Sequence, residues 1–468
     1  MTTSAAPLAS DGERPGEAVR PRVSLASLEQ AIVEKPPRRE FLAQIDALRD
    51  PIHEALTDAY GDPYFAKLLW LKASNYLFAR YQQACRHVQL VARPVTLMLD
   101  PSNSCQLACP GCVHSTNQEF TARMLWPPGV MRPAVFETLL QRIGPFALHA
   151  VLYNYGEPLL NKRLPEFIEA AHGHAMGVQL STNLSVPFDV ERFVEAAPEF
   201  VILSIDGATQ ESYARFRRNG NLTLVLDNLR RLVAAKRRRG SARPVLVWRF
   251  LTFEHNVHEV EDALALAKEI GVDVFRVGTP FDVSLDEPTI RVATSERRGI
   301  HPLQPVAPSP TPALRAALRH HASVEERFEE TWETRAAGLP EEPVRPDGKS
   351  CTWLYYNQSV DAGGRVIPCC IAPTTRKRLV FGDLADGDSD PWNSSTYQLA
   401  RLAFADREAF REARANTDAA PWCAVCPRQP DLTYDPQNGA SDLVQLDPQN
   451  LLTAGDPGLW WRLAARWS

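Results

Sequence analysis

Short apolar runs and amphipathic helical segments alternate between residues 93 and 280, and this alternation constrains the fold more than any other feature of the chain. Such a pattern is typical of βα units, whose strands pair in parallel. The runs expected to form strands are Val95–Leu99, Ala150–Asn154, Gly177–Leu180, Phe200–Ile205, Val245–Phe250 and Val272–Val277. The helices expected between them are Pro133–Arg142, Leu164–His172, Val190–Ala196, Leu224–Arg237 and Val257–Ile270.

Six units of this kind predict an α/β fold. They are too few for a complete eight-stranded barrel, but they suit a partial (β/α)6 TIM-like barrel over residues 93–280. A doubly wound open sheet is the alternative, because periodicity alone does not distinguish a barrel from a sheet. In either fold, functional residues are expected at the carboxyl ends of the strands.

The rest of the chain divides by composition. Five prolines between His301 and Pro312 indicate an extended linker rather than a packed element. The cysteine-rich segment after the linker has few periodic runs, as expected of a small domain organised around metal. The expected divisions are a disordered N-terminus (1–24), a helical extension (25–92), the barrel (93–280), the linker (281–345), the cysteine-rich domain (346–430) and a tail (431–468).

Composition excludes several classes of protein. The chain is 44% hydrophobic and 23% charged, as in ordinary globular proteins, and its net charge of −5 gives no footprint for nucleic acid. No stretch approaches the roughly 20 apolar residues of a membrane span, and the first residues lack a signal peptide's apolar segment. We therefore expect a cytoplasmic protein. Nine cysteines in a reducing compartment indicate metal ligation rather than disulfides.

Three of these cysteines lie on one loop. Cys105, Cys109 and Cys112 form a C-x₃-C-x₂-C pattern directly after the first expected strand. Thiolates are the standard ligands of iron–sulfur clusters, and three of them leave one iron of a four-iron cubane open to a small molecule. The alternative is structural zinc with a distant fourth ligand such as His114.

This loop, in its position after a first strand, resembles the radical S-adenosylmethionine (SAM) superfamily over Val95–Gly278. The resemblance implies a [4Fe–4S] cluster whose open iron binds SAM and cleaves it to a 5′-deoxyadenosyl radical, which abstracts a hydrogen from the substrate. It also implies a protein reductant such as flavodoxin or ferredoxin. One departure is Gly111, where family members often carry an aromatic residue.

Further motifs follow in the order that the family implies. Tyr155-Gly156-Glu157-Pro158 ends the second expected strand and resembles the family's Gly-Gly-Glu-Pro motif, although Tyr155 replaces its first glycine. By this resemblance the motif receives the amino group of SAM, and later polar residues contact its ribose and amino acid end. Simple turns, helix N-caps and a surface salt bridge are the alternatives. The candidate SAM-binding residues are Gly156, Glu157, Pro158, Ser181, Asn183, Ser204, Asp206 and Arg217, the last for the carboxylate.

A second set of cysteines lies near the C-terminus of the sequence: Cys351, Cys369, Cys423 and Cys426. Four thiolates can ligate one further cluster, and a Cys₄ zinc site is the alternative. The arrangement resembles the auxiliary iron–sulfur domains called SPASM and, in a shorter form, Twitch. No cysteine follows Cys426, which favours the single-cluster form, here an auxiliary [4Fe–4S] cluster. Cys370, beside Cys369, is a spare or the true ligand.

The resemblance predicts an enzyme that oxidises or crosslinks its substrate after hydrogen abstraction. Family members with such auxiliary domains include maturases of peptides or proteins and dehydrogenases of small sugar-derived molecules, and both remain open. A non-enzymatic electron carrier or redox sensor would use the same cysteines, but it would not need the Gly156-Glu157-Pro158 motif.

Overall fold

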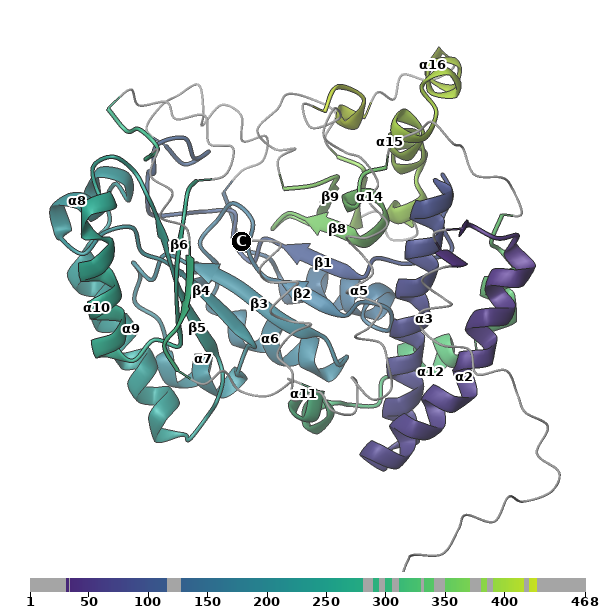
Figure 1. The fold of residues 1–468 in the computed structure, drawn as a ribbon, viewed down its shortest axis with the longest axis horizontal. Helices are drawn as coiled ribbons and strands as arrows, with labels where there is room; N and C mark the ends of the chain where they lie inside the picture. Colours follow the sequence, from purple (N-terminus) through teal and green to yellow (C-terminus); the bar gives the residue numbers. More distant parts are fainter. Residues whose placement is uncertain are drawn as a thin grey trace, which may run out of the picture.

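A computed structural model of the chain describes most residues between 31 and 426 (Figure 1). The expected disordered N-terminus (1–24) and the expected tail (431–468) lie outside the described part. The described ranges are 31–32, 34–115, 128–280, 289–293, 299–304, 311–329, 332–340, 350–370, 380–384, 390–415 and 421–426.

The centre of the protein is one sheet whose first six strands are all parallel. These strands and the helices between them confirm the expected repeated βα units, with ends that shift by a few residues. The described strands follow the order β10-β9-β8-β1-β2-β3-β4-β5-β6-β7. The first seven are β1 (Thr96–Leu99), β2 (His149–Val151), β3 (Gly177–Thr182), β4 (Phe200–Ser204), β5 (Val245–Leu251), β6 (Val274–Gly278) and β7 (Gly299–Pro302), which is antiparallel to β6.

Helices cover one face of this sheet (Figure 1). They pack on alternate strand residues such as Leu97, Leu180 and Trp248, all fully buried in one large core. Polar residues mark where some of these helices begin. Asp189 and Asn221 are the N-caps of two of them, and each side chain accepts a hydrogen bond from a backbone N–H of the first turn. The helices are α5 (Pro133–Ile143), α6 (Leu164–Gly173), α7 (Val190–Ala196), α8 (Gln210–Phe216), α9 (Leu222–Arg238) and α10 (Val260–Ile270), and sequence reasoning missed α8.

Other helices close the amino end of the strands. In this end layer, Phe65 and Leu68 of α3 (Pro63–Cys85) pack with Val247 of β5 and Val274 of β6. The predicted linker also contributes here, because α11 (Thr311–Ala317) and α12 (Ala322–Glu329) join the same apolar cluster. The expectation of an extended segment is therefore wrong for these residues, since a proline is tolerated in the first turn of a helix. The remaining elements of this layer and the linker are α2 (Arg38–Tyr60) and α13 (Trp332–Ala337).

The cysteine-rich segment continues the central sheet. Its strand β8 (Asn357–Val360) pairs in parallel with β1, and the antiparallel strands β9 (Arg365–Ile367) and β10 (Gly382–Asp383) follow. β1 would otherwise be an open edge, so β8 satisfies its backbone hydrogen bonds. The other elements of this region are α14 (Trp353–Tyr356), η5 (Pro391–Asn393), α15 (Ser395–Ala405), α16 (Arg407–Ala415) and η6 (Trp422–Val425).

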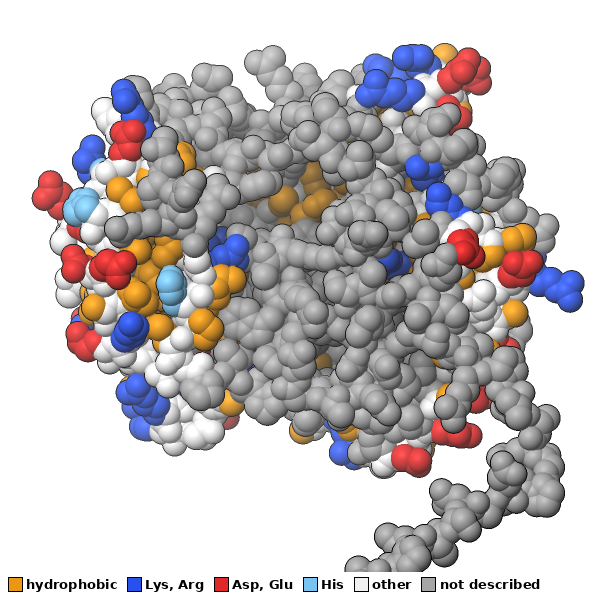
Figure 2. Space-filling model, viewed as in Figure 1, with side chains coloured by type: hydrophobic (Ala, Val, Ile, Leu, Met, Phe, Trp, Pro, Cys, Tyr) orange, Lys and Arg blue, Asp and Glu red, His pale blue; other side chains and the backbone are white. Residues whose placement is uncertain are grey.

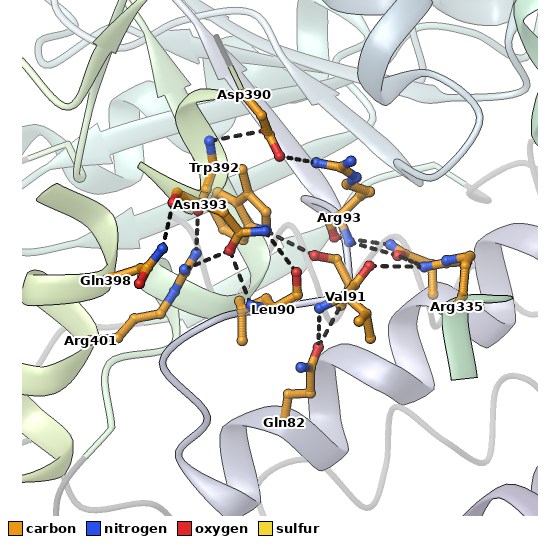
Figure 3. Close-up of polar contacts among 12 residues, drawn as sticks. Gln82, Leu90, Val91, Arg93, Arg335, Asp390, Trp392, Asn393, Gln398 and Arg401 are labelled. Atoms are coloured by element: carbon orange, nitrogen blue, oxygen red, sulfur yellow. Dashed lines mark hydrogen bonds and ion pairs between the residues drawn. The ribbon is translucent and has the colours of Figure 1, made fainter. Parts of the chain in front are cut away.

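A buried arginine ties this region to the segment that leads into β1 (Figure 3). Arg401 of α15 has no exposed surface, and its guanidinium donates to the carbonyl oxygens of Leu354, Val88 and Trp392 and to Asn393 Oδ1 at 2.8–3.2 Å. It also stacks on the Trp392 ring, 4.8 Å from the centroid. Five fixed N–H donors in one plane suit this set of acceptors, whereas a lysine offers three from one point.

We expect Arg401→Lys to lower the free energy of unfolding by about 2–4 kcal/mol, because at least two buried acceptors lose their donors. Urea denaturation followed by circular dichroism measures the change. Arg411→Lys is the matched control, because Arg411 is exposed on the neighbouring helix α16. The control is expected to stay within about 0.5 kcal/mol of the wild type. Equal effects of the two substitutions would contradict the role given to Arg401.

In the view of Figure 2, acidic and basic side chains of the described residues are mixed at both the left and the right edge of the molecule. No helix within the described ranges is long and apolar enough to cross a membrane.

Candidate functional site

The loop that carries the first three cysteines follows β1 and is held from three directions. Asn103 N donates to Gly129 O (3.1 Å), Ala108 N donates to Arg218 O (3.1 Å), and Glu157 N, beyond β2, donates to Ser104 O (2.8 Å). These contacts come from segments that are distant in sequence. The loop is therefore held by the connections that follow β1, β2 and β4 as well as by its own turns.

Gly156 makes the closest approach to this loop. A β-carbon built on Gly156 would lie 1.7 Å from the carbonyl oxygen of Ser102 and 2.5 Å from its carbonyl carbon. Only a glycine allows the two backbones to meet in this way. Gly111, within the loop, has a φ of 78°. This left-handed conformation explains why a glycine stands where the family often has an aromatic residue.

The three thiols of the loop lie near one another in an apolar setting. Cys109 is 8% exposed and packs with Phe216 and Phe253, while Cys105 and Cys112 flank this cluster. Burial raises the pKa of Cys105 to about 12 and that of Cys112 to about 11, and repulsion from neighbouring thiolates adds to both shifts. Three thiolates at this place therefore need a compensating positive charge, which a ligated metal group supplies.

Glu157 braces the site from within. Its side chain is 2% exposed; Oε1 accepts from Leu159 N (3.0 Å) and Thr182 Oγ1 (2.6 Å), and Oε2 accepts from Asn183 N (2.8 Å). Burial raises the pKa of Glu157, although these hydrogen bonds oppose the shift. The carboxylate thus joins the end of β2 to the end of β3. Pro158, which follows it, begins the short helix η1 (Pro158–Leu160).

Asn183 connects that brace to a cysteine. Its Nδ2 lies 3.6 Å from Cys105 Sγ, and its Oδ1 accepts from Gln106 Nε2 at 2.7 Å. The two predicted serines lie on the adjoining strands, where Ser181 Oγ and Ser204 Oγ are 3.2 Å apart. The structure thus brings Asn183 to the cysteine loop and the two serines to each other.

Asp206 and Arg217 form a buried ion pair beside the loop. Arg217 Nε donates to Asp206 Oδ2 at 2.6 Å, with side-chain exposures of 13% and 0%. Arg217 Nη1 lies 3.8 Å from Cys109 Sγ. Burial opposes the charge of Arg217, but Asp206 and Cys109 outweigh it, so the pKa of the guanidinium is raised. Arg217 therefore forms a salt bridge, as the alternative proposed, but with a buried partner rather than at the surface.

The second set of cysteines gathers beyond β9. Burial raises the pKa of Cys423, and the nearby charges of Cys351 and Cys426 raise it further. Burial raises the pKa of Cys351 to about 12, with smaller contributions from Cys426 and Cys370. Cys369 is 8% exposed, and its charge acts on Tyr397 together with that of Cys423. Both Cys369 and Cys370 therefore remain candidate ligands.

Sequence reasoning missed Asp100, which directly follows β1. Its side chain is fully buried, and Oδ1 accepts the backbone N–H groups of Tyr155 (2.9 Å) and Gly156 (3.4 Å). Burial raises the pKa of Asp100 to about 7. A carboxylate immediately after the first strand was the available signal. Its role is to fix the turn that brings Gly156 against the cysteine loop.

Nowhere in the described ranges do three His, Cys, Asp or Glu side chains converge closely enough to hold a single metal ion.

Two family models match the chain. The model described as the radical SAM superfamily matches residues 99–249, from the end of β1 to Arg249 on β5. Residues 99–249 therefore form a radical SAM domain. The model described as an iron–sulfur cluster-binding domain, SPASM, matches residues 351–427, which include the whole second cysteine set. The radical SAM domain binds a [4Fe–4S] cluster and SAM, and the SPASM domain binds auxiliary iron–sulfur clusters.

Curated relatives match part of the chain. The mycofactocin maturase MftC of Mycobacterium ulcerans is 25% identical over 181 residues, which are 38% of this chain and 45% of that protein. The PqqA peptide cyclase of Xanthomonas campestris pv. campestris is 28% identical over 194 residues, 40% of this chain and 47% of that protein. The chain thus spans about half the length of the relatives it matches.

Solved structures give weaker matches. SuiB of Streptococcus suis bound to S-adenosylmethionine is 14% identical, with a TM-score of 0.43, and the match covers 68% of this chain and 72% of that one. BtrN in complex with AdoMet and 2-DOIA is 16% identical, with a TM-score of 0.36 and coverage of 72% and 93%.

The residues present fit a radical SAM cluster. Three mutually repelling thiols share an apolar loop, the Arg217 guanidinium adds a positive charge next to Cys109, and Asn183 offers an N–H to Cys105. Hydrogen bonds to ligand sulfurs are a usual means of tuning such clusters.

Proposed function

We propose that Cys105, Cys109 and Cys112 hold the [4Fe–4S] cluster at which this chain cleaves SAM. When bound, the cluster supplies the electron that breaks the bond between the sulfur and the 5′ carbon of SAM, so that a 5′-deoxyadenosyl radical becomes available. The observation that carries the proposal is the meeting of three thiols on a loop braced by Gly156 and Glu157 at the carboxyl ends of parallel strands.

The surrounding residues have separate tasks in this proposal. Two carboxylate oxygens offer about four lone pairs, of which Glu157 uses three within the protein, so one is left to accept from the ammonium group of SAM. The hydroxyls of Ser181 and Ser204 suit its ribose. Arg217 keeps an Nη2 group for the carboxylate, while Asp206 fixes its orientation.

We propose a peptide substrate, from which the radical abstracts a hydrogen before the product is oxidised or crosslinked. The names of the matching relatives, a peptide cyclase and a maturase, support this choice over a small sugar-derived molecule. An auxiliary [4Fe–4S] cluster held by Cys351, Cys423, Cys426 and either Cys369 or Cys370 would accept the electron left after hydrogen abstraction. A flavodoxin or ferredoxin would supply the first electron.

Replacing Cys105, Cys109 and Cys112 together by Ala is expected to abolish 5′-deoxyadenosine formation and to remove about four irons per chain. The measurement is chromatography of the products after anaerobic reconstitution and reduction with dithionite, with iron assayed in parallel. Cys85→Ala is the matched control, because Cys85 is a buried cysteine of α3 that belongs to neither set. Reconstituted wild-type protein that yields no 5′-deoxyadenosine would rule out the proposal.

A further inference from the structure

Two arginines point from neighbouring strands into the interior of the partial barrel. Arg249 of β5 and Arg276 of β6 are direct neighbours in the parallel register. The residues that flank Arg249, Trp248 and Phe250, are fully buried in the core beneath the helices. Because side chains alternate along a strand, Arg249 and its neighbour in register lie on the opposite, inner face of the sheet.

The inner face of the sheet is apolar on the amino-terminal side of these two arginines. Val247 and Val274 precede them by two residues on the same face and are packed against α3, α11 and α12. Water therefore cannot reach the guanidinium groups from the amino end of the strands, and both arginines are half-buried. Burial lowers the pKa of Arg249 and of Arg276, which is the effect expected of cations that lack full solvation.

No carboxylate of the described residues compensates these two charges. Arg249 donates through Nη2 to the hydroxyl of Ser204 at 2.8 Å, and its buried Nε has no hydrogen-bond partner there. Within the described ranges neither arginine forms an ion pair with an acidic side chain. Asp206 is the carboxylate whose charge acts on Arg249, but it is already paired with Arg217 at 2.6 Å. Tyr153, which faces both arginines, is a neutral phenol.

Like charges on directly paired positions of adjacent strands repel each other. A fold keeps such a pair half-buried and uncompensated at a functional site when a ligand supplies the missing charge. Two guanidinium groups present parallel N–H donors that match the two oxygens of a carboxylate. Asn183 lies against Cys105, and two residues earlier Ser181 of β3 contacts Ser204 of β4, whose hydroxyl accepts from Arg249 of β5. The pair is therefore reached from the site of radical formation along one wall.

We propose that Arg249 and Arg276 bind a carboxylate of the substrate, such as an acidic side chain of the peptide. This inference rests on the proposed function, because it names the group that orients the peptide for hydrogen abstraction. The arginines are positioning residues: they hold an anionic group of the substrate and take no part in the transfer of the hydrogen.

The test is a ligand-observed NMR titration of the reconstituted, unreduced protein with N-acetyl-glutamate amide, and with N-acetyl-glutamine amide as the neutral probe. Wild-type protein is expected to bind the glutamate probe preferentially. Arg249→Gln combined with Arg276→Gln is expected to weaken that binding at least about tenfold. The matched control is Arg163→Gln with Arg238→Gln, which removes the same charge from side chains that are 58% and 62% exposed. This control is expected to bind as the wild type does.

Arg276→Gln alone keeps the test valid if the double variant does not fold. This single substitution is expected to leave the fold intact, because no described residue hydrogen-bonds the Arg276 side chain. It is expected to weaken binding at least about threefold. Equal binding of both probes, or unchanged binding by the arginine variants, would overturn the inference. Displacement of the probe by saturating SAM would also overturn it, since the site would then belong to the carboxylate of SAM. Probe binding requires no SAM cleavage, so its failure is distinct from a failure to form 5′-deoxyadenosine.

Discussion

Gly156→Ala is expected to abolish 5′-deoxyadenosine formation while leaving most of the fold in place. The added methyl group would lie 1.7 Å from the Ser102 carbonyl oxygen, and the atoms it meets are backbone that no side-chain rotation can move aside. The two loops must therefore separate. Separation would break the hydrogen bond from Glu157 N to Ser104 O and displace Cys105, the next residue. In the proposed site Cys105 holds the cluster, and displacement of a cluster ligand costs activity steeply.

Gly129→Ala is the matched control for this experiment. Gly129 also touches the base of the cysteine loop, through its carbonyl oxygen to Asn103 N, but a β-carbon there would find its nearest atom at 3.9 Å. Iron content, circular dichroism and product chromatography on both variants separate loss of the cluster from loss of the fold. A Gly156→Ala protein with full iron and wild-type turnover would show that the backbone contact is dispensable.

The sequence predicted those parts of the fold that depend on local pattern. Strands such as Phe200–Ser204 carry continuous apolar runs, and helices such as Val190–Ala196 carry a cap and a periodic face, so each can be recognised within its own residues. The cysteine loop was equally visible, because its three cysteines lie within eight residues, Cys105 to Cys112.

Features that depend on partners distant in the sequence could not be predicted. β8 reads Asn-Gln-Ser-Val, which has no strand-like apolar run, and it becomes a strand because it pairs with the exposed edge of β1. Glu157 was predicted as a ligand for SAM, but nothing local indicated that Thr182 and Asn183 would occupy half of its acceptor capacity. The pairing of Asp206 with Arg217 likewise follows from how α8 packs, and α8 itself was not predicted.

The free energy of unfolding is expected to fall steeply as the pH drops below about 6.5. Of the buried histidines, three carry this prediction: His87, His149 and His174, each at most 9% exposed. Burial lowers the pKa of His87 to about 4 and that of His149 and His174 to about 3. Each is therefore neutral in the folded protein at pH 5, while in the unfolded chain it titrates near 6.5.

Between pH 6.5 and about 4, the unfolded state therefore binds up to three more protons than the folded state. Stability therefore rises with pH across this window, by about 1.4 kcal/mol per pH unit for each proton and about 4 kcal/mol for three. Urea denaturation at intervals from pH 4.5 to 6.0, with the cluster absorbance recorded at each pH, measures this slope. A slope that corresponds to one proton or fewer would contradict the burial of these three side chains.

Single substitutions assign the slope to its residues. His174 stacks on His321 with centroids 4.1 Å apart and packs against Gly144, where a β-carbon would lie 2.7 Å from its ring. His174→Gln is expected to destabilise the protein at every pH, but also to reduce the slope by about 1.4 kcal/mol per pH unit, because one proton is no longer taken up. His258→Gln, at an exposed position of η2 (Val257–Glu259), should leave the slope unchanged. A purely structural effect of His174→Gln would shift the whole curve without changing its slope, so the slope isolates the contribution of the buried neutral imidazole.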